Sequence, residues 1–170
     1  MKKNYDEPMF VDKSTNINAE QKINIKNNIR ELLNSESFAV LSTQGDGQPY
    51  SSLICFAYSD DLKKLVFATP VETRKFNLIV KSDRVSILVD NRSNNPESLN
   101  QIQAVTITGK ASILKDNNES QKWSQLLIKS HPYLEGFVKS PTTGIIKVNV
   151  CRYFYVSKFQ EVIEWSPQQN

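Results

Sequence analysis

Apolar residues recur along this chain at two spacings, and each spacing predicts its own kind of element. The first run repeats every three or four residues, which places its members on one face of a helix: Ile25, Ile29, Leu32 and Leu33. Just before it, Asn18 and Gln21 match a capping box, in which each side chain bonds the backbone N–H of the other residue. The pattern predicts a helix of about four turns that begins after Asn18.

After this helix the apolar positions alternate with polar ones, which is the period of a β-strand. Residues 37–43 and 49–58 form two expected strands, joined by a hairpin turn at residues 44–48, where the glycines tolerate positive backbone angles. Residues 64–69 follow after a second turn, so these three strands predict an antiparallel meander. The same period predicts four more strands, at residues 84–90, 101–114, 143–156 and 160–165.

Two further helices are expected between the strands. Residues 118–130 carry Trp123, Leu126 and Leu127 at helical spacing and end before a proline. A shorter helix is expected where the strand at residues 64–69 ends. There Thr69 can cap a helix, Pro70 suits its first position, and Glu72 lies three residues after the cap. The polar stretch at residues 91–100 is expected to be a loop.

Together these elements predict a mainly β fold with helices (α+β). Six or seven antiparallel strands, with two or three helices, are expected to close into a barrel, because closure removes exposed strand edges. Residues 1–17 mix charges, asparagines and a proline without periodicity, so we expect a flexible N-terminal arm. The domain itself is expected to span residues 18–170.

Length, charge and composition limit the number of domains, the kinds of partner and the location that we expect for this chain. With 170 residues, 39% of them hydrophobic, the chain is long enough for one core and too short for two ordinary domains. The formal net charge is +3 and the cations are scattered, which gives no support for a nucleic-acid partner. No apolar run has the length of a signal peptide or a membrane span, so we expect a cytoplasmic protein without a membrane partner. Cys55 and Cys151 each lie in an apolar stretch and are expected to be reduced core residues.

The start of the short helix carries the most specific chemistry. A helix N-terminus offers unpaired N–H groups and a partial positive charge, and Thr73, Arg74 and Lys75 lie within its first turns. Arginine binds phosphate through two donors, lysine adds a compact charge, and a threonine hydroxyl adds a hydrogen bond. The pattern predicts a phosphate site. Spacing alone also allows Arg74 and Lys75 to be solvated residues on a surface helix.

Six segments, taken in order, help to decide between a phosphate site and a solvated helix: residues 39–43, 47–52, 67–69, 73–78, 82–90 and 104–111. Together they resemble the pyridoxamine 5'-phosphate oxidase-like family, the flavin-binding split barrels. Each segment alone is weakly specific, but their order agrees with the antiparallel sheet predicted independently from the alternation. The similarity covers roughly residues 29–156 and implies a split β-barrel, which favours the phosphate site over a solvated helix.

The resemblance also implies a homodimer that binds FMN at the subunit interface. Arg74 and Lys75 would grip the FMN phosphate, with Thr73 beside them. By the same resemblance, Ser51, Ser52 and Leu53 would lie along the flavin, and Ala68 and Thr69 would face the ribityl chain or the phosphate. Asn77 also matches a cofactor contact of the family, but a solvated position on the helix is an equal alternative for it. A glutamine of the second subunit reaches the cofactor in the family. Here Ala104 holds the best-matching place, and Gln103 lies one residue away, on the opposite face of a regular strand.

For function, the resemblance implies an FMN-dependent oxidoreductase that acts on a small organic substrate, with the flavin carrying the redox chemistry. No catalytic residue is assigned. The vitamin-forming oxidase of the family holds its substrate phosphate with a C-terminal arginine and histidine, and residues 161–170 contain neither. The alternative is a non-catalytic split barrel that binds a flavin, haem or deazaflavin for sensing, storage or stress protection.

The remaining candidates have structural explanations. His131, the sole histidine, is expected to cap a helix or make a surface contact, with haem ligation as a minority alternative. Trp123 is expected to pack its helix onto the barrel, and Tyr153, Phe154 and Tyr155 to lie in the core or an interface. Arg92 and Asn94 either line the rim of the pocket or are solvated. Glycine-rich nucleotide loops, paired carboxylates and His/Cys clusters are absent from the sequence, so a Rossmann dehydrogenase, a P-loop protein and a zinc enzyme are poorly supported.

Overall fold

The computed structural model describes residues 18–92, 102–157 and 161–168. The strands are β1 (Phe38–Gly45), β2 (Gln48–Tyr58), β3 (Lys64–Pro70), β4 (Arg84–Asp90), β5 (Ala104–Ile113), β6 (Thr143–Ser157) and β7 (Glu161–Trp165). The helices are α1 (Ala19–Ser35), α2 (Arg74–Lys81), α3 (Asn117–Ser130) and α4 (Glu135–Val138), with a 3-10 turn, η2, at Pro132–Leu134. The predicted arm at residues 1–17 and Asn94 lie outside the described residues.

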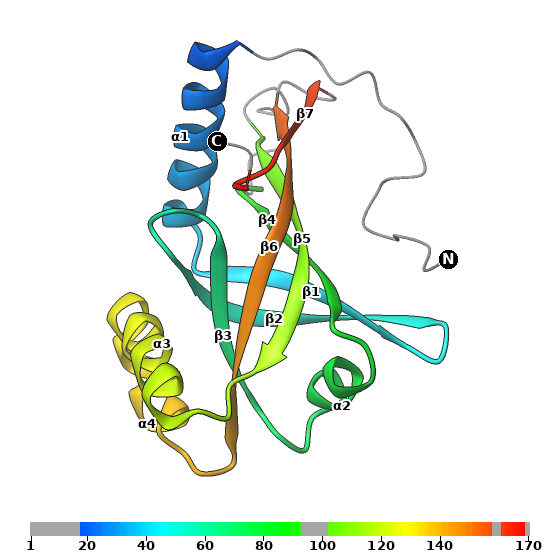
Figure 1. Ribbon diagram of the computed structural model, residues 1–170, viewed down its shortest axis with the longest axis vertical. Helices are drawn as coiled ribbons and strands as arrows, with labels where there is room; N and C mark the ends of the chain where they lie inside the picture. Colours follow the sequence, from blue (N-terminus) through cyan, green and yellow to red (C-terminus); the bar gives the residue numbers. More distant parts are fainter. Residues whose placement is uncertain (1–17, 93–101, 158–160, 169–170) are drawn as a thin grey trace.

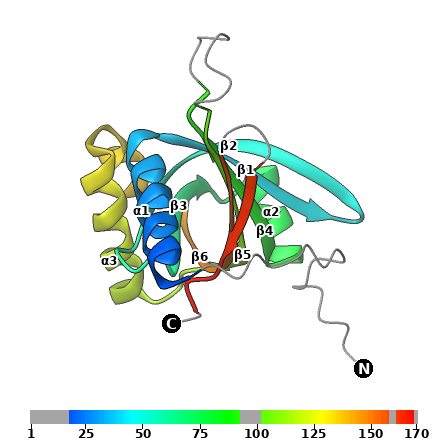
Figure 2. The ribbon, with the colours of Figure 1, turned by 90° about the horizontal axis from the view of Figure 1, so that it is seen from above.

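The strands form one antiparallel sheet in the order β3-β2-β1-β4-β5-β6-β7. A further pairing between β3 and β6 closes six of these strands into a barrel, and β7 extends the sheet beyond β6 (Figure 1). Seen from above, α1 and α3 lie on one side of the barrel and α2 lies on the other (Figure 2). The predicted α+β split barrel is thus confirmed. The described residues hold four α-helices rather than two or three, because the four-residue α4 leaves too short a pattern in the sequence to be recognised.

Helix α1 follows the sequence prediction closely. Asn18 N donates to Gln21 Oε1 at 2.9 Å, and Gln21 N donates to Asn18 Oδ1 at 2.8 Å, which completes the capping box. The apolar face is buried in the main core through the four predicted residues: Ile25, Ile29, Leu32 and Leu33. Within the described residues, no helix is both long and apolar enough to cross a membrane.

The longest strand, β6, contains an irregularity that the alternation does not reveal. Thr108 of β5 pairs with Arg152, whereas the next residue, Gly109, pairs with Val150, so Cys151 is the extra residue of a β-bulge. The bulge shifts which residues of β6 face the core. Before it Val148 and Val150 are buried, and after it Tyr153 and Tyr155 are buried. Both strands of the pair therefore keep a continuous apolar face toward the core.

Both cysteines are reduced, but the expectation that they are core residues is wrong. Cys55 and Cys151 are only half-buried. Cys55 lies on the outer face of β2, because its neighbours Ile54 and Phe56 point into the barrel, and Cys151 lies in the bulge. An apolar neighbourhood in the sequence does not decide which face of a strand a residue occupies.

Tyr153 fixes the turn that joins β2 to β3. It is fully buried, and its hydroxyl donates to the carbonyl oxygen of Leu62 at 2.7 Å. Leu62 has a positive φ of 59°, an unusual conformation for a non-glycine residue that its surroundings must stabilise. Burial raises the pKa of Tyr153, so its hydroxyl keeps the proton that it donates.

Replacing Tyr153 with phenylalanine is expected to lower the free energy of unfolding by about 1–2 kcal/mol, because it leaves the buried Leu62 carbonyl without its donor. Urea unfolding of both proteins measures the change. Tyr133→Phe is the comparison variant: Tyr133 is 67% exposed and its hydroxyl makes longer contacts, 3.3 Å to His131 Nδ1 and 3.8 Å to Cys55 Sγ, so its effect should be smaller, about 0.5 kcal/mol. Equal effects of the two substitutions would contradict this role of Tyr153.

Candidate functional site

Helix α2 carries the predicted cations, but it begins later than the sequence predicts. Its N-cap is Thr73 rather than Thr69, and Pro70 is the last residue of β3, opposite Thr143 of β6. The N–H of Val71 donates to the carbonyl of Thr142 at 2.9 Å, which continues the strand pairing. The fixed φ of a proline suits an extended strand end as well as a first helical turn, so Pro70 did not distinguish the two. Arg74 and Lys75 become the first two helical residues.

The two threonines at this end of the helix are bonded to each other and to the backbone. Thr73 Oγ1 donates to the carbonyl of Pro70 at 2.8 Å and accepts from the N–H of Phe76 at 3.4 Å. Because its one proton is used in this way, Thr69 must be the donor in the 3.0 Å contact between the two hydroxyls. Both hydroxyl protons are therefore committed inside the protein. The remaining donors at the start of α2 are the first backbone N–H groups, which have no acceptor within the helix, and the two cations.

Beside the start of α2, one edge of strand β2 has no strand partner within the part of the chain that the structure describes. Its ladder with β3 contains only Phe56, Ala57 and Tyr58. Among the described strands, residues 49–55 pair with β1 alone, and β3 turns away to pair with β6 (Figure 1). We call residues 49–55 of β2 the open edge.

Lys75 lies against the open edge. Its ammonium group donates to the carbonyl oxygen of Leu53 at 2.9 Å, and burial lowers the pKa of this half-buried lysine. The Leu53 carbonyl therefore points away from β1. In an antiparallel strand the N–H and C=O of one residue point the same way, and so do those of residues two positions along. Ser51, Leu53 and Cys55 consequently direct their backbone groups out of the open edge.

Arg74 lies over the ring of Tyr50, with its guanidinium carbon 4.9 Å from the ring centre. This cation–π contact orients the side chain without using its N–H donors, which stay able to bind an anion. Tyr50 is a candidate site residue that sequence reasoning missed. Tyr50 directly precedes the predicted Ser51 on β2, whereas Arg74 belongs to α2. The sequence does not show that these two elements bring the side chains together.

The two serines of the open edge differ in their surroundings. Ser51 is exposed, and its hydroxyl lies 3.2 Å from that of Ser42 on β1. Ser52 faces the other side of the strand. Among the buried side-chain nitrogen and oxygen atoms in the described part of the chain, its hydroxyl oxygen is the one without a hydrogen-bond partner. A buried hydroxyl without a partner costs about 1–3 kcal/mol, which makes Ser52 a candidate for contact with a ligand.

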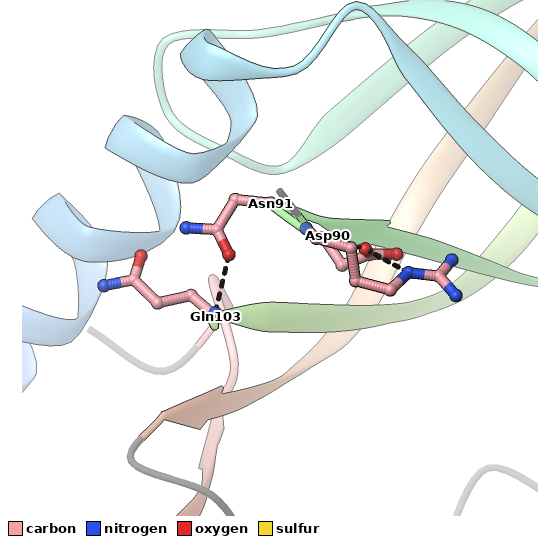
Figure 3. Close-up of polar contacts among 4 residues, drawn as sticks. Asp90, Asn91 and Gln103 are labelled. Atoms are coloured by element: carbon pink, nitrogen blue, oxygen red, sulfur yellow. Dashed lines mark hydrogen bonds and ion pairs between the residues drawn. The ribbon is translucent and has the colours of Figure 1, made fainter. Parts of the chain in front are cut away.

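The other predicted site residues occupy different positions. Ala68 is half-buried on β3, opposite Ile145, and Asn77 is exposed on α2. Gln103 lies at the far end of the β4–β5 pair, where Asn91 N donates to its carbonyl at 3.1 Å and its own N–H donates to Asn91 Oδ1 at 2.7 Å (Figure 3). Arg92 bonds Asp90 at 2.5 Å next to it. The structure brings together the residues of β2, β3 and α2 but leaves Gln103 and Arg92 apart from them.

His131 is both a helix cap and a buried residue. It is 4% exposed and is the C-cap of α3, so the expected cap is confirmed and the expected surface position is wrong. Its Nε2 lies 2.7 Å from the carbonyl of Phe56, and its Nδ1 lies 3.3 Å from the Tyr133 hydroxyl. Each ring nitrogen thus lies within hydrogen-bond distance of a group of the protein. Trp123 is buried where α3 packs on the barrel, as expected.

Two comparisons relate this chain to known proteins. The family model described as pyridoxamine 5'-phosphate oxidase matches residues 25–157. A comparison with curated proteins found no match. Among solved structures, the fold is similar to that of three proteins from different bacteria. A haem-binding protein from Mycobacterium smegmatis is 14% identical with a TM-score of 0.74, and the match covers 84% of this chain and 58% of that chain. General Stress Protein 26 from Bacillus anthracis is 20% identical with a TM-score of 0.62, and the match covers 84% of this chain and 98% of that chain. An FAD-binding protein from Mesorhizobium loti is 16% identical with a TM-score of 0.61, and the match covers 82% of this chain and 94% of that chain. At these identities the likeness shows the fold.

Proposed function

The chain belongs to the pyridoxamine 5'-phosphate oxidase family, and from this premise we propose that it is an FMN-dependent oxidoreductase acting on a small organic substrate. The observation that carries the proposal is the position of Arg74 and the start of α2 beside the open edge of β2. A phosphate end and a hydrogen-bonding edge for a flat ring thus lie next to each other. The cytoplasmic location expected from the sequence is part of the same proposal.

The phosphate of FMN fits the start of α2. Free N–H groups of the first helical residues and the positive end of the helix dipole favour an anion there. Arg74 adds a guanidinium whose donors are not used by its contact with Tyr50. The Thr69 and Thr73 hydroxyls support the site indirectly, because their bonds hold the turn between β3 and α2 in shape.

The ring of FMN fits the open edge. The pyrimidine side of a flavin presents alternating N–H and C=O groups. The N–H and C=O of Ser51 and the N–H of Leu53 present the complementary kind of edge, while the Leu53 C=O accepts from Lys75. The Ser52 hydroxyl, which has no hydrogen-bond partner within the described residues, is a further group that the flavin could contact. When bound, the flavin supplies the redox chemistry, while these residues bind it, orient it and exclude water.

A second copy of the chain is the partner that we propose for the outer face of the barrel. Cross-strand neighbours from β2 to β6 form one row on this face: Leu53, Val40, Leu88, Thr106 and Phe154. Leu53 is 66% exposed and Phe38, near it on β1, is 57% exposed. Large apolar side chains that adjoin in this way are typical of a subunit interface. A homodimer that covers this face would also enclose the open edge.

The first test is a visible absorption spectrum of the purified protein, recorded before and after incubation with FMN and passage through a desalting column. We expect flavin bands that are retained with the protein. A protein that stays colourless would refute flavin binding, and retained haem bands after parallel incubation with haem would favour the haem alternative. Turnover of a reductant faster than with free FMN then separates an enzyme from a non-catalytic carrier.

A further inference from the structure

We propose that Cys55, Tyr133 and His131 form a thiol site, in which the Cys55 sulfur exchanges with small disulfides while His131 takes its proton through the Tyr133 hydroxyl. The three side chains come from two parts of the chain. Cys55 lies on β2, whereas His131 is the C-cap of α3 and Tyr133 lies in the 3-10 turn that follows it. None of these side chains is assigned to the binding of FMN, so the inference stands apart from the proposed function.

The three side chains form a line of contacts that leads from the thiol into the protein. Cys55 Sγ lies 3.8 Å from the Tyr133 hydroxyl, and this hydroxyl lies 3.3 Å from His131 Nδ1. His131 Nε2 lies 2.7 Å from the carbonyl oxygen of Phe56, the residue that follows Cys55 on β2. Tyr133 is exposed, Cys55 is half-buried and His131 is buried. The imidazole is thus held in the interior, while the thiol end lies near the surface.

The Phe56 carbonyl decides the direction of every hydrogen bond in this line. A carbonyl oxygen can only accept, so His131 Nε2 carries a proton and donates it. In the neutral ring Nδ1 then has no proton and accepts from the Tyr133 hydroxyl. Because the proton of that hydroxyl is used, the Cys55 thiol is the donor in its contact with the Tyr133 oxygen. All the donors between sulfur and imidazole therefore point toward His131.

This direction is the one that removal of the thiol proton requires. As the sulfur attacks, its proton passes to the Tyr133 oxygen, and the Tyr133 proton passes to His131 Nδ1. Both ring nitrogens then donate, Nε2 to the Phe56 carbonyl and Nδ1 to the tyrosine oxygen, so no hydrogen bond is lost. The hydrogen bond with Cys55 raises the pKa of Tyr133, which keeps the tyrosine neutral between the two groups. A nucleophile, a base and a group that orients the base are the parts of an activated nucleophile.

The exchange forms one covalent bond and breaks another. Cys55 Sγ bonds to one sulfur of a small disulfide, the bond between the two sulfurs of that disulfide breaks, and its second half leaves as a thiolate. The proton held by His131 then returns to this thiolate or to solvent. Cys55 is oxidised to a mixed disulfide, and the leaving half is reduced to a thiol. The small disulfide is thus the oxidant, and no other co-reactant is needed.

A purely structural explanation accounts for only part of this arrangement. The bond from His131 to the Phe56 carbonyl ties the end of α3 to β2, and this role needs neither an exposed tyrosine nor a thiol. The neighbour of Cys55 across the β1–β2 pair is Phe38, which does not titrate. Lys75 of α2 bonds the carbonyl two residues before Cys55, and the variants below leave that cation in place. The reactivity of the thiol therefore distinguishes a relay from a structural contact.

The experiment follows one cysteine at a time in its reaction with dithiobis(nitrobenzoate), an aromatic disulfide that releases a coloured thiolate. Cys151→Ser leaves Cys55 as the thiol, and Cys55→Ser leaves Cys151, which is also half-buried and serves as the matched control. His131 is the sole histidine of the chain and is held against β2, whereas Cys151 lies on β6. Relative to its own limiting rate at high pH, Cys55 should react about tenfold faster than Cys151 at about pH 6.5.

Tyr133→Phe, made in the Cys151→Ser protein, removes the relay and keeps the aromatic ring. The pH at which Cys55 reacts at half its limiting rate should rise by about one unit or more, as for loss of a hydrogen bond to a charged group. The limiting rate at high pH measures access to the thiol, so the comparison separates ionisation from exposure. His131→Gln keeps a donor for the Phe56 carbonyl without a base and should give the same rise. If His131→Gln does not fold, Tyr133→Phe decides.

The expected product is a single nitrobenzoate thiol attached to Cys55, which the mass of the modified peptide identifies. A pH profile of Cys55 that Tyr133→Phe leaves unchanged would overturn the inference, because the thiol would then ionise without the relay. The same holds for a Cys55 profile that matches that of Cys151. A Cys55 that does not react in the folded protein overturns it as well, whether the thiol stays protonated or a second copy of the chain covers it.

Discussion

Replacing Arg74 with glutamine should weaken FMN binding by about 10- to 100-fold, because charge-assisted hydrogen bonds to a phosphate are each worth about 1.5–3 kcal/mol. Riboflavin binding should change little, since it offers no phosphate. The fold should be unaffected, because the side chain is exposed and its contact in the protein is with the Tyr50 ring. Fluorescence titration of both flavins against the variant measures these effects.

Arg30→Gln controls for the removal of one positive charge. Arg30 on α1 donates to the carbonyl of Asp60, in the turn between β2 and β3, and has no part in the proposed site. Its loss should leave the affinity for FMN within about twofold, as for a charge that acts only through screened, long-range forces. An FMN affinity that is unchanged in Arg74→Gln, or lowered equally in both variants, would contradict the assignment of Arg74.

Gly109→Ala is expected to destabilise the barrel by about 3 kcal/mol, although it adds only one methyl group. A Cβ built at Gly109 would lie 2.5 Å from the carbonyl oxygen of Asn149 and 2.7 Å from Val148 Cγ1. The first of these is backbone, so relief requires β5 and β6 to move apart beside the bulge at Cys151. Urea unfolding, compared at equal protein concentration, measures the loss.

Gly136→Ala makes the same chemical change where there is room. Gly136 lies in α4. Apart from its two chain neighbours and the backbone of its own helix, no described atom lies within 4 Å of the added Cβ. Alanine is preferred to glycine in a helix by about 0.5–1 kcal/mol, so this variant should equal or exceed the original protein in stability. A Gly109→Ala protein that is as stable as Gly136→Ala would show that the β5–β6 pair yields more easily than its packing indicates.

Much of the fold could be predicted because each strand and helix carries its own period. All seven strands and α1 fall where the alternation and the capping box place them. The bulge at Cys151 could not be predicted, because a bulge depends on how two strands pair and not on one strand's pattern. The start of α2 was misplaced because Thr69 and Thr73 both suit a cap, and only the pairing of Pro70 with β6 decides between them.

The candidate site was predictable only in part, for a related reason. The adjacent cations at the start of a helix are visible in the sequence, and the structure places Arg74 and Lys75 there. Their partners, the Tyr50 ring and the Leu53 carbonyl, come from β2, and this contact depends on how α2 packs against the barrel. Arg74 and Lys75 are adjacent cations in the sequence, but they contact different groups of β2, and only the packing of α2 shows this difference.

The open edge also has a consequence for the behaviour of the protein during its synthesis. Unpaired backbone groups on a strand are a template on which another chain can add a strand, and this is a common start of aggregation. Two residues oppose it here: Pro49, which lacks an N–H on that edge, and Lys75, which occupies the Leu53 carbonyl. The chain is therefore protected against strand addition at residues 49 and 53 before any ligand is bound, and the proposed flavin and second copy would cover the rest of the edge.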